Sequence, residues 1–137
     1  MAGIVAGWFL PPPWPGGLHP ALSVAGGVLA GAGIGFAGWA YRSLGSSFTA
    51  YTRPPDTAVR VESGPYRLVR HPMYGGMILF FAGVSLAFSI TSLALTAALA
   101  ALWRAKSAAE ERILVERFPE YARYRRRATH RFWPYLY

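Results

Sequence analysis

Two polar clusters in an otherwise apolar chain contain the residue types that could do chemistry. Residues 64–76, GPYRLVRHPMYGG, combine arginines, a histidine and two tyrosines, and the acid pair Glu110 and Glu111 follows later in the chain. Arginine and histidine donate hydrogen bonds to carboxylates or phosphates, whereas glutamates accept them from ammonium groups and hydroxyls. If the two clusters lie together, they would suit a ligand that carries both kinds of charge.

The first cluster is expected to stand at the start of a helix. Pro72 suits the first helical position because that position needs no backbone N–H, and His71 would then be the N-cap. Tyr74 would lie within one turn of His71 and point the same way. The free N–H groups of this helix, with Arg67 and Arg70 nearby, favour a carboxylate or phosphate.

Two long uncharged stretches predict an all-α integral membrane protein. The chain has 137 residues, and none is charged from 1 to 41 or from 72 to 103. Each stretch exceeds the roughly 20 apolar residues that span the hydrocarbon layer. The basic clusters next to them are typical of cytoplasmic flanks beside anionic lipid, so we expect the bilayer as partner and no nucleic acid. The expected location is the cytoplasmic membrane.

The N-terminal half, residues 1–45, is expected to hold one full transmembrane helix. Residues 1–10 could form a short additional helix, and they lack the basic n-region of a cleaved signal peptide. Within the main helix, Gly27, Gly31 and Gly35 recur every four residues. We interpret this face as a contact with the chain's own helices, with a dimer interface as the alternative.

The second uncharged stretch predicts a transmembrane helical hairpin, because both of its ends are basic and the positive-inside tendency favours one side for both. The hydroxyl-rich residues 89–92, SITS, offer a helix break. Beyond Trp103 the helix would continue out of the membrane as far as Pro119, which places Glu110 and Glu111 near the depth of His71. The remaining aromatic and basic residues suit a cytoplasmic tail at the headgroup surface.

These motifs resemble those of the isoprenylcysteine carboxyl methyltransferases and the related phospholipid N-methyltransferases. Residues 64–76 match the pattern GPYRxxRHPxYxG, residues 110–114 match EExxL, and residues 118–124, FPEYARY, are similar to the family's C-terminal segment. The resemblance implies a single domain with a cofactor-binding catalytic core at residues 64–137. It implies transfer of a methyl group from S-adenosylmethionine to a lipophilic carboxylate, amine or thiol at the membrane interface.

The resemblance also implies which residues form the site. The implied cofactor-binding residues are Arg70, His71, Pro72, Tyr74, Gly76, Glu110, Glu111, Tyr121 and Tyr124. The implied catalytic residues are Lys106, Arg104 and Glu111, and we rank Glu111 above Glu110 as a cofactor ligand. Lys106 stands where members that methylate prenylcysteine carry arginine, and lysine lacks the bidentate fork. A small lipophilic acceptor is therefore as well supported as a prenylated protein.

Two alternatives remain at this point. Membrane sterol reductases share an RHPxY-like element and use NADPH, although paired acids would repel its additional phosphate. A non-catalytic membrane module that binds lipid or a partner helix is the other alternative. No metal site is predicted, because the chain has no cysteine and its three histidines are far apart in the sequence.

Overall fold

The structure is a computed structural model that describes residues 19–45, 63–88 and 90–134. This part of the chain is helical, as predicted, and contains α2 (His19–Leu44), the short 3-10 helix η2 (Gly64–Arg67), α3 (Pro72–Phe88), α4 (Ile90–Arg117) and α5 (Tyr121–Arg127). A parallel bridge pairs Val69 with His130. The short helix predicted in residues 1–10 lies outside them.

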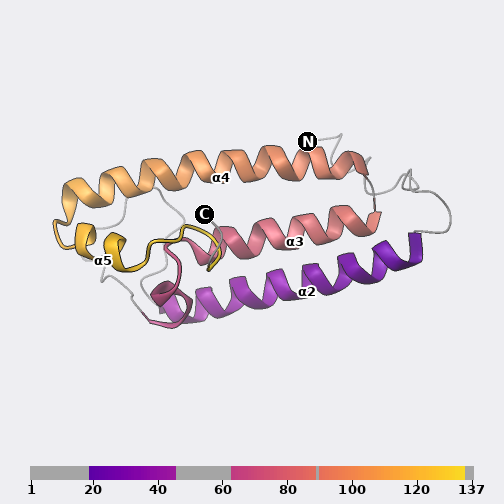
Figure 1. Cartoon of the computed structure of the whole chain (residues 1–137), viewed down its shortest axis with the longest axis horizontal. Helices are drawn as coiled ribbons and strands as arrows, with labels where there is room; N and C mark the ends of the chain where they lie inside the picture. Colours follow the sequence, from indigo (N-terminus) through magenta and orange to yellow (C-terminus); the bar gives the residue numbers. More distant parts are fainter. Residues whose placement is uncertain (1–18, 46–62, 89, 135–137) are drawn as a thin grey trace.

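The three long helices lie side by side, with α3 between α2 and α4 and each antiparallel to the next (Figure 1). Because α3 ends at Phe88 and α4 begins at Ile90, the predicted hairpin is present and its break falls at the start of SITS. With 28 residues against the 17 of α3, α4 projects beyond its neighbour. The projecting part carries the two acids, and α5 folds back towards it.

α2 and α3 contact each other through glycine and alanine. Gly33 and Gly76 are buried where the two helices meet, and a Cβ added to Gly76 would lie 2.7 Å from both the Gly33 carbonyl oxygen and the Ala37 backbone nitrogen. Such a distance is too short for a real carbon contact, so any larger residue would push the helices apart.

The packing predicted for Gly27, Gly31 and Gly35 is wrong. All three are exposed, and a Cβ added to any of them would meet nothing within 4 Å. The buried face instead includes Gly26, Gly33 and Ala40, which recur every seven residues. A seven-residue spacing stays on one face of a helix, whereas each step of four advances about 40° around it.

Hydrogen bonds between hydroxyl groups join α3 to α4. Ser85 Oγ lies 2.9 Å from Thr96 Oγ1, and Thr96 in turn donates to the Phe81 carbonyl at 3.3 Å. Both side chains are buried, so these bonds form where water cannot compete. They hold the apolar arms of the hairpin in register.

One described helix, α2, is long and apolar enough to cross a membrane by its length and composition. The apolar part of α3 is shorter. At the end of α2, Trp39 and Tyr41 are 48% and 54% exposed. The placement of the hairpin and the tail relative to a membrane stays a prediction.

Candidate active site

A tight turn brings the RHP segment to the end of α2. Gly64 has a φ of +57°, a conformation that glycine adopts without strain, and it opens η2 against Ser43 and Trp39 of α2. The buried Pro65 then accepts backbone hydrogen bonds from Leu68 and Val69 through its carbonyl. The predicted turn at Gly64–Pro65 and the helix start at Pro72 are both confirmed.

The C-terminal tail, residues 128–134, lies across the start of α3. The backbone N–H of Arg70 donates to the His130 carbonyl at 3.1 Å, and that of His71 donates to the Arg131 carbonyl at 2.8 Å. One turn further along, the indole N–H of Trp133 donates to the Gly75 carbonyl at 3.2 Å. The beginning of α3 is therefore paired with the tail by backbone and side-chain bonds.

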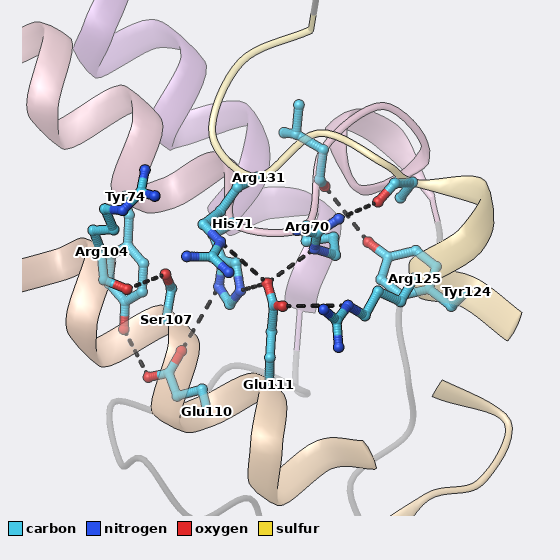
Figure 2. A network of polar contacts seen from close by, with 12 residues as sticks. Arg70, His71, Tyr74, Arg104, Ser107, Glu110, Glu111, Tyr124, Arg125 and Arg131 are labelled. Atoms are coloured by element: carbon cyan, nitrogen blue, oxygen red, sulfur yellow. Dashed lines mark hydrogen bonds and ion pairs between the residues drawn. The ribbon is translucent and has the colours of Figure 1, made fainter. Parts of the chain in front are cut away.

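Glu111 lies at the centre of the polar contacts (Figure 2). Its side chain is 4% exposed, and its Oε1 accepts hydrogen bonds from Arg70 Nε at 2.9 Å and His71 Nε2 at 3.0 Å. Two arginines from α5 and the tail complete the surroundings, with Arg131 Nε at 3.5 Å from Oε1 and Arg125 Nε at 3.7 Å from Oε2.

These partners decide the protonation state of Glu111. Burial alone would raise the pKa of its carboxyl group, but hydrogen bonds from His71 and Arg70, together with the charge of Arg70, outweigh burial and lower the pKa to about 2. Glu111 is therefore ionised at neutral pH. Such a group holds cations in place but is a poor proton acceptor.

Arg70 connects Glu111 to the tail. While its Nε donates to the carboxylate, its Nη1 donates to the carbonyl oxygens of Ala128 at 2.8 Å and Thr129 at 2.6 Å. The Arg70 guanidinium group therefore binds groups of the protein itself. Arg70 was expected to bind a ligand anion at the start of α3, and in this structure it binds Glu111 and the tail instead.

Glu110, one residue earlier on α4, has different surroundings. Its Oε1 accepts the Tyr74 hydroxyl at 2.8 Å and lies 3.9 Å from Lys106 Nζ, while Oε2 lies 3.7 Å from His71 Nδ1. The side chain is 17% exposed, and that of Lys106 is 36% exposed. Glu110 therefore has more contact with solvent and fewer close cations than Glu111.

Stacked aromatic rings lead from these acids towards the apolar hairpin. The His71 and Tyr74 rings are 5.7 Å apart, Tyr74 and Trp103 are 6.1 Å apart, and both pairs are nearly parallel. Trp103 continues the series to Phe81 at 6.0 Å. The ammonium group of Lys106 lies 5.5 Å from the Tyr74 ring centroid, a cation–π distance.

Four more residues implied by the resemblance are buried. Pro72 is the buried first residue of α3, and Gly76 packs against α2. Tyr121 and Tyr124 are buried in a cluster beside Leu114 and Phe118.

Tyr124 and Arg104, two of the residues implied by the resemblance, take part in bonds that support the site. The Tyr124 hydroxyl donates to the Tyr66 carbonyl at 2.8 Å, which ties α5 to η2. The Arg104 carbonyl accepts the hydroxyl of the fully buried Ser107 at 2.9 Å, and the Arg104 side chain lies on the Tyr74 side of the site (Figure 2).

Sequence reasoning missed the roles of Arg125, Arg131 and Trp103. The two arginines belong to the basic C-terminal region, for which the sequence predicts a segment at the headgroup surface, and no periodicity indicates which of its arginines point inward. In the sequence Trp103 marks only the end of the uncharged stretch. Its spacing from Glu110 and Lys106 on one helix was the signal that could have placed it at the site.

The chain matches the sequence profile of the family described as phospholipid methyltransferase over residues 22–121, from α2 to the first residue of α5. It therefore belongs to this family of membrane methyltransferases. The family match and the apolar α2 together support a membrane protein. Arg125 of α5 and Arg131 of the tail lie beyond the matched range.

One curated relative is the cobalt-zinc-cadmium resistance protein CzcN of Cupriavidus metallidurans. The two sequences are 44% identical over 80 residues, which are 56% of this chain and 36% of the relative. The chain thus spans little more than a third of that relative's length. No solved structure matches the chain.

Proposed function

We propose that the protein transfers a methyl group from S-adenosylmethionine to a lipophilic acceptor at the membrane interface. One observation carries the proposal. Three segments that are far apart in the sequence, namely the start of α3, the projecting part of α4 and the tail, meet at Glu110 and Glu111. The first two hold the family-like motifs at residues 64–76 and 110–114, and the tail follows the motif at residues 118–124.

The residues at this meeting point suit the proposed cofactor. S-adenosylmethionine has an ammonium group and ribose hydroxyls, which need acceptors such as Glu110, and a carboxylate, which needs donors such as Arg131. Its sulfonium is favoured by an aromatic face, and Tyr74 and Trp103 present stacked rings beside the acids. Acceptor, donor and aromatic groups are thus all present in one site.

The two acids have separate roles in this proposal. Glu111 is ionised, buried and surrounded by cations, so we assign to it the task of holding Arg70 and, through Arg70, the tail. Glu110 is more exposed and bonded to Tyr74, so we assign the cofactor contact to Glu110. This assignment reverses the ranking expected from the sequence.

The cofactor would supply an electrophilic methyl group, and the chain's residues would align the acceptor with it and exclude water. An acceptor carboxylate is already ionised at neutral pH and needs no base. An acceptor amine would have to lose a proton, and Glu110 is the better base because the pKa of Glu111 is held at about 2. In either case the other product is S-adenosylhomocysteine.

The proposed topology has α2 and the α3–α4 hairpin crossing the bilayer, with the acid pair at its cytoplasmic face. The last turn of α2 carries Arg42, and this end of α2 lies at the same end of the bundle as the start of α3 (Figure 1). The polar cofactor would arrive from the cytoplasm, and the acceptor would arrive from the lipid. Reporters fused after Tyr137 and inserted near Asp56 should both be cytoplasmic; opposite locations would contradict the hairpin topology.

No metal-binding function is proposed, although the name of the relative concerns metal resistance. In the described ranges, no group of three or more His, Cys, Asp or Glu side chains could hold a metal ion. The family match favours methyl transfer over the NADPH-dependent alternative.

The test is equilibrium binding of labelled S-adenosylmethionine and of NADPH to the purified protein, followed by methyl transfer to a lipid extract. We expect saturable binding of S-adenosylmethionine, no binding of NADPH, and one labelled lipophilic product whose chemistry identifies the acceptor. Binding of NADPH alone would support the reductase alternative. Binding of neither would support a non-catalytic module.

A further inference from the structure

α5 has two dissimilar sides. On one side Tyr121 and Tyr124 are each 4% exposed and pack towards Leu114 and Phe118. The rest of this seven-residue helix carries four exposed arginines, namely Arg123, Arg125, Arg126 and Arg127. We call these four residues the α5 arginine face.

The arginine face concentrates positive charge. Arg123 is three residues from Arg126 and four from Arg127, which are the spacings at which helix side chains are neighbours and like charges repel. α5 itself contains no acid, and Glu120 directly precedes it. Of the four, Arg125 also reaches inward to Glu111 at 3.7 Å while its side chain stays 54% exposed. A nearby anionic partner would offset this repulsion.

The depth of this face follows from a series of contacts. Tyr124 of α5 donates a hydrogen bond to η2, and η2 packs through Gly64 against Ser43 and Trp39 at the end of α2. Exposed aromatic residues followed by arginine at the end of a spanning helix mark the interfacial layer, and α2 ends with Trp39, Tyr41 and Arg42. In the proposed topology, these contacts place α5 at the depth of the lipid headgroups.

We propose that the α5 arginine face binds the headgroups of anionic phospholipids. Charge complementarity and depth both point to this partner, because the cytoplasmic leaflet carries anionic lipid and basic segments near it are attracted within a Debye length. The proposal does not depend on the methyl-transfer reaction. It assigns the outer side of α5 to lipid and the inner side to the support of Glu111.

The experiment uses the full chain in a neutral detergent, titrated with phosphatidylglycerol or with phosphatidylcholine of the same acyl chains. Native mass spectrometry measures the apparent dissociation constant of each lipid. The variants are Arg126→Gln, the double variant Arg123→Gln/Arg126→Gln and the matched control Arg112→Gln, which removes one exposed charge from α4. Thermal unfolding of each variant checks that the fold is retained.

We expect phosphatidylglycerol to bind more tightly than phosphatidylcholine and to weaken as salt is added. Arg126→Gln should weaken it by roughly fivefold and the double variant by roughly twentyfold, because each basic residue near a lipid surface contributes similarly. Arg112→Gln should change it less than twofold.

Four results would overturn the proposal. The first is equal affinity for the two lipids, and the second is an equal effect of Arg112→Gln and Arg126→Gln, which would indicate net charge alone. The third is a single-stranded oligonucleotide that binds more tightly than phosphatidylglycerol and loses that binding in the double variant, because this would assign the face to nucleic acid. Displacement of the lipid by equimolar inorganic phosphate would likewise contradict it.

Discussion

Glu110 and Glu111 are adjacent on α4, yet they occupy opposite kinds of surroundings. Glu111 is 4% exposed on its side chain and has arginines from three segments and His71 around it. Glu110 is 17% exposed, accepts the Tyr74 hydroxyl and has Lys106 at the edge of ion-pair distance. A step of one residue, about 100° around the helix, therefore separates an enclosed acid from a partly exposed one.

The largest expected effect is that of Glu111→Gln. The change leaves Arg70 and Arg131 without their buried counter-ion, and breaking a buried ion pair typically costs about 3–5 kcal/mol. We expect a clear drop in melting temperature. Protection of the Arg70 and His71 backbone amides in hydrogen exchange should also be lost, because these amides donate to tail carbonyls that the Arg70 side chain no longer holds in place. The exposed acid Glu116 provides the control, since Glu116→Gln should change neither quantity. An unchanged melting temperature in Glu111→Gln would contradict the structural role.

The pH dependence should report the same group. The pKa of Glu111 lies at about 2 in the folded chain against an ordinary value of 4.5. A lowered pKa stabilises the folded state fully above the ordinary value, and this stabilisation, about 3 kcal/mol at most, is lost as the pH falls towards 2. The difference in unfolding free energy between wild type and Glu111→Gln should therefore be constant from pH 7 to about 5 and shrink below that. A difference that shrinks instead near neutral pH would assign the effect to another group.

Glu110→Gln should act on the ligand and leave the fold intact. It keeps the size of the side chain but loses charge-assisted hydrogen bonding worth about 1.5–3 kcal/mol, or roughly ten- to a hundredfold in affinity for S-adenosylmethionine. Because Glu110 is partly solvated, the melting temperature of the protein without cofactor should stay nearly fixed. A large loss of stability with unchanged affinity would place Glu110 with Glu111.

Tyr74→Phe should have the smallest effect of the series. It removes the 2.8 Å hydrogen bond to Glu110 but keeps the ring that stacks between His71 and Trp103. A neutral donor to a carboxylate contributes about 1 kcal/mol, so the affinity for S-adenosylmethionine should fall by only several-fold. Tyr41→Phe, at the tyrosine that is 54% exposed near the end of α2, is the control and should leave this affinity unchanged.

Several features of the fold could be predicted from the sequence because local rules decide them. Pro72 specifies a helix start, Gly64 and Pro65 specify a turn, and SITS breaks a long apolar stretch. The meeting of His71 with the acid pair followed from the hairpin, which places both near one end of the bundle.

Other features depend on partners that no local pattern identifies. Both Gly27 and Gly33 belong to series of small residues in the sequence. Only Gly33 of the two packs against α3, because Gly76 of α3 lies opposite it. The pairing of Val69 with His130 joins backbone segments about sixty residues apart, and its register determines that Arg131 lies near Glu111. For the same reason the sequence alone did not indicate which of the two acids is enclosed.

The division between the two acids is tested most directly by isothermal titration of S-adenosylmethionine into the wild type, Glu110→Gln and the Glu116→Gln control under identical detergent conditions. We predict saturable binding to the wild type and the control with equal affinity, and binding to Glu110→Gln that is at least tenfold weaker at an unchanged melting temperature. Equal affinity of Glu110→Gln and the wild type, or no binding of S-adenosylmethionine to any of the three, would contradict the proposed site.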